Sequence, residues 1–310
     1  MKVVVTGGAG YVGTELVKQL ADRESISQIT VLDNLSRNNF NLFLDYPFEG
    51  NTKVKFVQGD ILDSRTLSKI FSGIDVVYHL AANVTTPFAN LDPHLYEQVN
   101  HWGTSDVAYM AEKCGVKRLI YLSSTSIYGA SSELINEETI PSPKTYYGIS
   151  KFRGEGHLVP LMDKMKVIIV RCGNVYGYSH SMRFDAVVNK FVFEANYFNR
   201  ITIQGDGKQS RAFIHIDSVS DILSQLASNK IDSGTFNLVE NNYSVIEIVD
   251  ELKSILPSLE FLFVDQHVGL RTITVDTDNR LKSFVFMPES PPLKDKLERF
   301  LSHFSFGSTN

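Results

Sequence analysis

The glycine-rich segment TGGAGYVG, residues 6–13, leaves few choices of fold for this chain. It follows the β-branched run VVVT without a break and precedes a helix-like stretch that we expect over residues 11–21. Gly8, Gly10 and Gly13 satisfy the pattern G-x-G-x-x-G, with Gly7 just before them. Because glycine lacks a Cβ, the turn can tighten and its N–H groups can approach an anion at the positive end of the helix dipole. The segment predicts a strand–turn–helix unit that binds an anion.

The first half of the chain continues this alternation of apolar strands and amphipathic helices. We expect strands over residues 29–33, 54–60, 75–82, 118–124 and 167–171. A helix between the third and fourth of these begins near Asp92 and Pro93, a favourable cap and first-turn pair, and ends near Cys114 and Gly115. Apolar strands separated by helices predict an α/β fold with a Rossmann-type doubly wound parallel sheet.

The alternation changes after Arg171. A helix is expected over residues 186–195, short strands at 201–204, 213–216 and 236–239, and a last helix over 292–303. We interpret this half as a smaller, interleaved C-terminal lobe. The expected division is a Rossmann domain at 1–172, with 211–240 returning to it, and a second lobe at 173–210 and 241–310.

Composition narrows the class of partner. With 310 residues, 43% of them hydrophobic, and a formal charge of −5, the chain carries no electrostatic signature for nucleic acid or an anionic membrane. Its two cysteines, Cys114 and Cys172, lack metal-ligand spacing, so we expect reduced thiols and no metal site. The first residues enter a strand with no leader-like segment before it, and no apolar run approaches membrane-spanning length. We therefore expect a cytoplasmic protein.

An acidic residue strengthens the nucleotide-binding interpretation of the glycine turn. Asp33 lies twenty positions after Gly13, at the end of the second expected strand. A carboxylate at this position accepts hydrogen bonds from the hydroxyls of an adenosine ribose and repels a 2′-phosphate, which favours NAD over NADP. Arg37 weighs the other way, because an arginine there can host that phosphate. Asp60 and Ile61, after the third strand, are expected near the adenine, although Asp60 alone is equally typical of a helix cap.

Tyr147 and Lys151 lie four positions apart in YYGISK, so on a helix they share one face. A lysine cation and an oxidised nicotinamide both favour a phenolate and are expected to lower the pKa of the tyrosine. Such a tyrosine accepts a hydroxyl proton while the nicotinamide takes the hydride. A lone Y-x-x-x-K is more often a pair on a helix surface, and Tyr146 points elsewhere on the same helix.

Taken together and in order, TGGAGYVG, VLDNLS, GDI, HLAAN, SSTSIYG and YYGISK resemble the extended short-chain dehydrogenase/reductase family, the NAD-dependent nucleotide-sugar epimerases and dehydratases. RCGNVYG and GDGKQSRAFIHIDSV extend the resemblance over nearly the whole chain. It implies a catalytic triad of Ser124, Tyr147 and Lys151, with Ser123 as the alternative to Ser124. It also makes the second lobe the substrate-binding one and implies a homodimer formed by the helix at 100–113 and the helix carrying Tyr147.

The resemblance also implies two sets of contacts. The expected cofactor-binding residues are Gly7, Gly10, Tyr11, Val12, Asp33, Asn34, Asp60, Ile61, Leu80, Ala81, Ala82, Asn100, Tyr147 and Lys151. The expected substrate-binding residues are Thr85, Ser124, Thr125, Tyr147, Asn174, Arg211 and Arg271, with Asn83, Thr86, Phe88 and residues 176–183 as further pocket candidates. Ala212 replaces an aspartate of the family pattern, and the segment around Arg271 matches poorly. A helix-face amide, a turn residue and a surface ion pair remain the plain alternatives for Asn100, Asn174 and Arg211.

The residues after Ser124 bear on the reaction. Dehydratases of the family have Asp-Glu there, whereas this chain has Thr125 and Ser126, whose hydroxyls do not act as general acids near neutral pH. Elimination is disfavoured, and the expected activity is a nucleotide-sugar 4-epimerase with tightly bound NAD. The alternatives are a 4-ketoreductase or 4-dehydrogenase, less readily a 4,6-dehydratase, and, from another class, a non-catalytic NAD(P)-sensing Rossmann protein.

Overall fold

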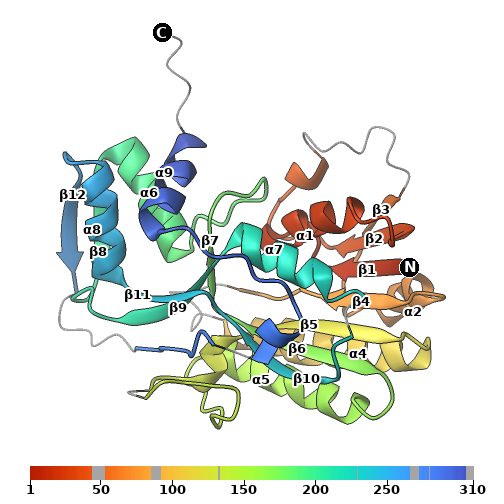
Figure 1. The fold of residues 1–310 in the computed structure, drawn as a ribbon. Helices are drawn as coiled ribbons and strands as arrows, with labels where there is room; N and C mark the ends of the chain where they lie inside the picture. The colour runs from red at the N-terminus through yellow and green to blue at the C-terminus, as the bar shows by residue number, and fades with distance from the viewer. Residues whose placement is uncertain are drawn as a thin grey trace.

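The computed structural model describes residues 1–43, 53–84, 92–131, 133–228, 230–265, 272–278 and 280–304. Its central sheet has seven parallel strands in the order β10-β6-β5-β4-β1-β2-β3 (Figure 1). The strands are β1 (Lys2–Thr6), β2 (Gln28–Asp33), β3 (Val54–Gln58), β4 (Val76–His79), β5 (Arg118–Ser124), β6 (Lys166–Cys172) and β10 (Gly234–Leu238). All the strands expected in the first half of the chain are present, which confirms the α/β prediction.

Helices cover both faces of this sheet. On one face lie α1 (Tyr11–Ala21) and α7 (Ile216–Gln225), and on the other α2 (Ser64–Phe71), α4 (Gly103–Lys113) and α5 (Tyr146–Leu158). Successive strand residues point to opposite faces, so Val3 and Val5 pack in the core with α1, whereas Val4 packs in the core with α2 and α4. The sheet is therefore doubly wound, as predicted.

The second lobe is built around two small sheets. One has the order β11-β9-β7, and the other pairs β12 with β8. These strands are β7 (Asn174–Tyr176), β8 (Arg200–Gln204), β9 (Ser210–His215), β11 (Asn241–Ser244) and β12 (Glu260–Val264); the helices α6 (Val187–Phe198), α8 (Val245–Ile255) and α9 (Leu293–Ser302) pack together beside them (Figure 1). Residues 211–240 were expected to return to the Rossmann domain. Of the elements in this segment, β10 is a strand of the large sheet and α7 packs against that sheet, whereas β9 is a strand of the second lobe.

One long helical segment connects β4 to β5 and lies on the face of the sheet that α2 and α5 also cover. It consists of α3 (Pro93–Tyr96), a π-helical stretch (Glu97–Trp102) and α4, and it begins and ends where the sequence predicted. Asp92 caps it by accepting a hydrogen bond from the backbone N–H of Leu95. Short 3₁₀ helices lie at Asn41–Phe43, Thr125–Tyr128, Val159–Leu161 and Arg280–Ser283. No helix among the described residues has the length and apolarity required to cross a bilayer.

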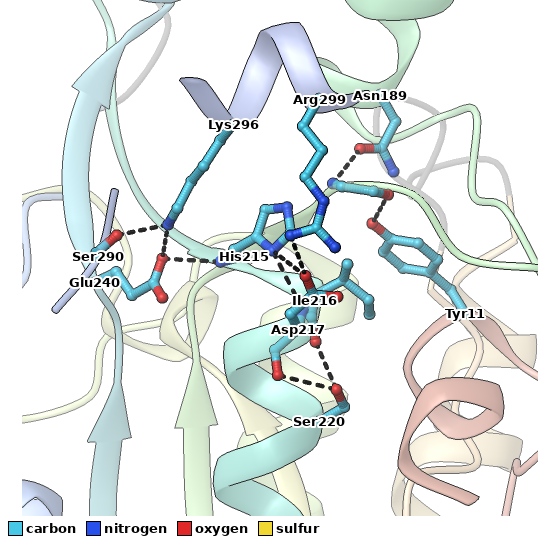
Figure 2. Close-up of polar contacts among 11 residues, drawn as sticks. Tyr11, Asn189, His215, Ile216, Asp217, Ser220, Glu240, Ser290, Lys296 and Arg299 are labelled. Atoms are coloured by element: carbon cyan, nitrogen blue, oxygen red, sulfur yellow. Dashed lines mark hydrogen bonds and ion pairs between the residues drawn. The ribbon is translucent and has the colours of Figure 1, made fainter. Parts of the chain in front are cut away.

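A buried hydrogen bond joins the two lobes beside the glycine turn. The hydroxyl of Tyr11, the first residue of α1, donates to the carbonyl of Gly177 at 2.6 Å, and the N–H of Gly177 donates to Asn189 Oδ1 at 3.1 Å (Figure 2). Gly177 has a φ of 116°, and a Cβ there would lie 2.7 Å from Nε2 of His215. Only glycine fits this junction without displacing its neighbours.

A second buried junction holds the C-terminal helix. Lys296 of α9 donates to Glu240 Oε2 at 2.8 Å, and the same oxygen accepts the backbone N–H of His215 at 3.0 Å (Figure 2). Both charged side chains are buried. The ion pair therefore fixes α9 to Glu240, just after β10, and through Glu240 to the end of β9.

Candidate active site

A cavity of about 880 Å³ lies where the central strands end at their carboxyl edge. Its walls come from the residues after β1, β2, β3, β4, β5 and β6 and from the second lobe. Ligands of open parallel sheets bind at this edge, because successive strand ends and helix N-termini converge there. The cavity collects most of the predicted site residues: Gly7, Gly10, Tyr11, Val12, Asp33, Asn34, Asp60, Ile61, Leu80, Ala81, Ala82, Ser124, Thr125, Tyr147, Lys151, Asn174 and Arg211. Thr85, Thr86, Phe88 and Arg271 lie outside the described residues.

The glycine turn fits the pyrophosphate of a dinucleotide. Gly7 has a φ of 72°, and a Cβ on it would lie 2.5 Å from the backbone nitrogen of Ala81. A Cβ on Gly13 would lie 2.3 Å from the carbonyl oxygen of Gly7, so α1 packs against the turn through its missing side chain. Gly10 caps α1 without any side-chain hydrogen bond. Within the described part of the chain, no side chain caps the first N–H groups of this helix, which suits an anion at the cavity wall.

Asp33 is the last residue of β2, the strand that pairs with β1 on the side away from β4. Its Oδ2 accepts the N–H of Ala9 at 3.0 Å and its Oδ1 accepts the N–H of Leu35 at 2.9 Å. These bonds fix the orientation of the carboxylate and leave lone pairs for ribose hydroxyls. Partial burial raises the pKa of Asp33, and the two backbone hydrogen bonds oppose that rise. Arg37, the residue that favoured NADP, instead lies 3.6 Å from Asp185 in an ion pair.

Ser124, Tyr147 and Lys151 come together from β5 and α5. Thr145 caps α5 by accepting the N–H of Gly148, which places Tyr147 in the first turn and Lys151 one turn later. Ser124 Oγ accepts hydrogen bonds from the N–H and the hydroxyl of Ser126, at 3.2 and 2.9 Å. The three side chains of the expected triad therefore line one wall of the cavity.

Burial dominates the protonation of this wall. It raises the pKa of Tyr147, and the charge of Arg183 and a hydrogen bond with Ser124 oppose the rise. Arg183 is thus a cation that favours the phenolate, and the expected effect of Lys151 on the pKa of this tyrosine stays a prediction. Burial lowers the pKa of Lys151 to about 7, and its Nζ lies 4.0 Å from the ring centre of Tyr121. The protein alone therefore holds the tyrosine neutral and the lysine close to its titration point.

Asn100 lies behind the lining residues of the cavity, and its expected place among the cofactor-binding residues stays a prediction. It is fully buried in the π-helical stretch. Its Oδ1 accepts the N–H of Asn83 at 2.7 Å, and its Nδ2 donates to the carbonyl of Asn83 at 3.0 Å and to Ser150 Oγ at 3.1 Å. Asn100 thus fixes the chain after β4 to α5, behind the cavity wall.

Asn174 and Arg211 face the cavity from the second lobe. Asn174 Nδ2 donates to the carbonyl of Ala212 at 3.1 Å, and Arg211 Nη1 donates to the carbonyl of Ser210 at 2.9 Å. Asn34 donates to Asp60 Oδ2 at 2.9 Å and thereby links the ends of β2 and β3. The contacts of these residues with ligands remain predictions.

The sequence interpretation missed one cavity residue, Cys172, whereas Arg183 ends the segment 176–183 that was expected at the pocket. Cys172 pairs with Ser124 in the register of β5 and β6, so the thiol lies in the wall beside the triad, and burial raises its pKa to about 12. Arg183 lines the cavity and forms an ion pair with Asp185 at 3.1 Å. Parallel register predicts the place of Cys172, since strand ends align, but no local pattern marks Arg183. Among the described residues, no cluster of three or more His, Cys, Asp or Glu is arranged to hold a metal ion.

The doubly wound sheet, the uncapped glycine turn, the oriented Asp33 and the Ser-Tyr-Lys wall define a dinucleotide-binding enzyme of the Rossmann class. The chain belongs to the NAD dependent epimerase/dehydratase family, whose model matches residues 3–238. NAD is therefore its cofactor, as the sequence predicted.

Characterised and putative relatives span several reactions. The chain is 31% identical over 225 residues to a putative UDP-glucose 4-epimerase of Methanocaldococcus jannaschii, with 70% of each chain covered. It is 29% identical over 257 residues to the dTDP-D-glucose 4,6-dehydratase of Mus musculus, covering 81% of this chain and 72% of the relative. Among solved structures, it is similar to the UDP-glucuronic acid 4-epimerase of Bacillus cereus in complex with UDP-glucuronic acid and NAD, with a TM-score of 0.88, 25% identity and coverage of 98% and 100%.

Proposed function

We propose that this protein is an NAD-dependent nucleotide-sugar 4-epimerase. The observation that carries the proposal is the identity of the residues beside Ser124: Thr125 and Ser126 line the cavity and offer only hydroxyls. The described carboxylates of the cavity wall are Asp33 and Asp60, at the ends of β2 and β3, and Asp185, which is paired with Arg183. Elimination of water from the sugar needs a general acid and base, whereas epimerisation at C4 needs only the triad.

Tyr147 and Ser124 act on the 4-hydroxyl of the sugar in this proposal. The phenolic oxygen of Tyr147 accepts the proton of the 4-hydroxyl. The Ser124 hydroxyl donates a hydrogen bond to the C4 oxygen of the sugar while the bond between that oxygen and C4 becomes a double bond. NAD held by the glycine turn and Asp33 would supply reversible hydride acceptance at C4. After the keto-sugar has turned its other face, Tyr147 gives the proton back to the C4 oxygen, so the reaction is redox-neutral.

Lys151 and Arg183 support this proton transfer by charge. The ammonium of Lys151 stabilises the tyrosine phenolate one helical turn away, and Arg183 favours the same charged form. Arg211 and Asn174 are proposed to hold the diphosphate, because a guanidinium fork donates two hydrogen bonds to phosphate oxygens. This assigns the Rossmann domain to the cofactor and the lobe of β7, β8, β9 and α6 to the nucleotide sugar.

The test is incubation of the purified protein with UDP-, GDP-, CDP- and dTDP-sugars without added cofactor, followed by NMR. We expect interconversion of one pair of C4 epimers and cofactor that copurifies with the protein. Tyr147→Phe should abolish conversion, whereas Tyr146→Phe, a matched change on an exposed neighbouring tyrosine, should leave it intact. Formation of a 4-keto-6-deoxy sugar would replace epimerase with dehydratase, and a requirement for external NADPH would indicate a ketoreductase.

We also propose a homodimer formed by the helical segment containing α4 and by α5. Trp102 and Tyr109 are each 57% exposed on the first and Phe152 is exposed on the second, which is an unusual concentration of aromatic surface for neighbouring helices. Trp102→Arg should convert the dimer to a monomer in light scattering after gel filtration. Phe198→Arg, which changes an exposed aromatic of α6, is the control and should remain dimeric. A Trp102→Arg protein of unchanged mass would refute this interface.

A further inference from the structure

A buried carboxylate lies directly behind the triad. Glu155 is on α5, one turn after Lys151, and its side chain is only 3% exposed. Its Oε1 accepts the hydroxyl of Ser123 at 2.5 Å and the Nε of Arg171 at 3.2 Å, and its Oε2 accepts Nη2 of Arg171 at 2.8 Å. One carboxylate thus joins α5, β5 and β6. It does not line the cavity, so it has no direct contact with a ligand there.

Each partner of Glu155 is the chain neighbour of a cavity residue. Ser123 precedes Ser124, Arg171 precedes Cys172, and these two pairs face each other in the register of β5 and β6. The strands pack against α5, whose other turns carry Tyr147 and Lys151. The hydrogen bonds of Glu155 therefore fix the separation of the serine on β5 from the tyrosine and lysine on α5.

Glu155 also supplies negative charge to a lysine that is 1% exposed. Burial lowers the pKa of Lys151, and the Glu155 charge opposes the fall. Titratable groups beside Lys151 among the described residues include Tyr121 on β5, His79 on β4 and, one turn earlier on α5, Tyr147. Burial lowers the pKa of His79 to about 3, so this histidine is neutral at physiological pH.

Arg171 forms a buried ion pair with the carboxylate, with 2.8 Å between its Nη2 and Glu155 Oε2. A buried carboxylate without a partner would take up a proton, but the bidentate guanidinium and the serine hydroxyl satisfy both of its oxygens. The guanidinium in turn donates to the hydroxyl of Tyr128 at 2.9 Å, so Arg171 is itself held in place. The result is a fixed anion behind Lys151.

We propose that Glu155 is a positioning residue for the reaction: it holds Ser124 in register with α5 and keeps the Lys151 ammonium charged beside Tyr147. The inference rests on the proposed function of these three residues. It adds a fourth side chain, outside the cavity, on which their charge state depends.

The test separates charge from hydrogen bonding. Glu155→Gln keeps an acceptor for Ser123 and removes the charge, whereas Ser123→Ala removes that hydrogen bond and keeps the charge. Because Glu155→Gln leaves Arg171 buried without a counter-ion, a double variant, Glu155→Gln with Arg171→Met, provides a neutral version that tolerates burial. All are made in the full-length protein.

The first readout needs no substrate. Lysine labelled with ¹³C at Cε reports the titration of each lysine by NMR, and the Lys151 signal is assigned by its loss in Lys151→Met. We expect the Lys151 titration to move to lower pH by about one unit or more in both Glu155 variants, the range for losing an opposite charge nearby. Ser123→Ala should leave it in place. An unchanged titration in the Glu155 variants would overturn the proposal.

The second readout is the pH dependence of kcat for epimerisation. Loss of the ammonium at lower pH should move the alkaline limb of kcat to lower pH in the Glu155 variants, whereas Ser123→Ala should lower kcat without moving the limb. If the Lys151 titration shifts in the Glu155 variants but the wild-type protein converts no sugar, the effect of Glu155 on Lys151 stands and the proposed function is refuted. A shifted NMR titration with an unmoved kcat limb would overturn the link to catalysis.

Discussion

The buried ion pair between Lys296 and Glu240 offers a direct test of how the C-terminal helix is held. Lys296 Nζ lies 2.8 Å from Glu240 Oε2 and 2.5 Å from Ser290 Oγ, and the two charged side chains are 9% and 7% exposed (Figure 2). Lys296→Met keeps the length and apolar stem of the side chain but leaves the carboxylate buried without its counter-ion. The N–H of His215 remains as a neutral donor to Glu240.

Removing one partner of a buried pair is expected to lower the free energy of unfolding by about 3–5 kcal/mol, because an uncompensated charge stays behind. An exposed pair would contribute only about 0–1 kcal/mol. Equilibrium unfolding in urea measures the difference. Lys294→Met, on the exposed side of the same helix, is the matched control and should stay within about 0.5 kcal/mol of wild type.

A double variant, Lys296→Met with Glu240→Gln, should recover most of the loss, since no buried charge remains. If Lys296→Met and Lys294→Met destabilise the protein equally, Glu240 is reached by water and the argument from burial is wrong. If the double variant is as unstable as Lys296→Met, the loss comes from the missing hydrogen bonds of Lys296 to Glu240 and Ser290 and not from an uncompensated charge.

Two further changes test the cofactor site, and a third tests the hydrogen bond that joins the two lobes beside it. Gly13→Ala places a Cβ 2.3 Å from the carbonyl oxygen of Gly7, so overpacking by about 1–3 kcal/mol should displace the turn and weaken NAD binding in calorimetry; unchanged affinity would contradict the close-packed turn. Asp33→Asn removes the charge that repels a 2′-phosphate and should lower the ratio of NADP to NAD dissociation constants, a ratio that stays constant if Asp33 does not face the ribose. Tyr11→Phe leaves the buried carbonyl of Gly177 without its 2.6 Å donor and should reduce the free energy of unfolding by about 1–3 kcal/mol in urea, whereas no change would mean that water replaces the hydroxyl.

Local patterns determined the order of elements and the cofactor. The glycine turn lies between an apolar strand and a helix, and Asp33 follows at the end of the next strand. Together they specify a dinucleotide-binding unit within one short segment of the chain, because the turn geometry and the helix dipole are local properties. The helix at 11–21 begins and ends where the sequence predicted. The spacing of Tyr147 and Lys151 likewise needed only the helical repeat, and both residues line the cavity.

Tertiary structure decided the pKa values of the site residues and which side chains pack behind them. Parallel register brings Cys172 beside Ser124, and packing of α5 on β5 and β6 joins Glu155 to residues 16 and 32 positions away. The charge of Arg183 favours the phenolate of Tyr147, and sequence spacing could not show this, because burial and distance set a pKa and neither is a property of spacing. The sequence by itself therefore determined the glycine turn, Asp33 and the expected triad, which meet in the cavity, and only the folded chain decided which further groups join them and how each is charged and held.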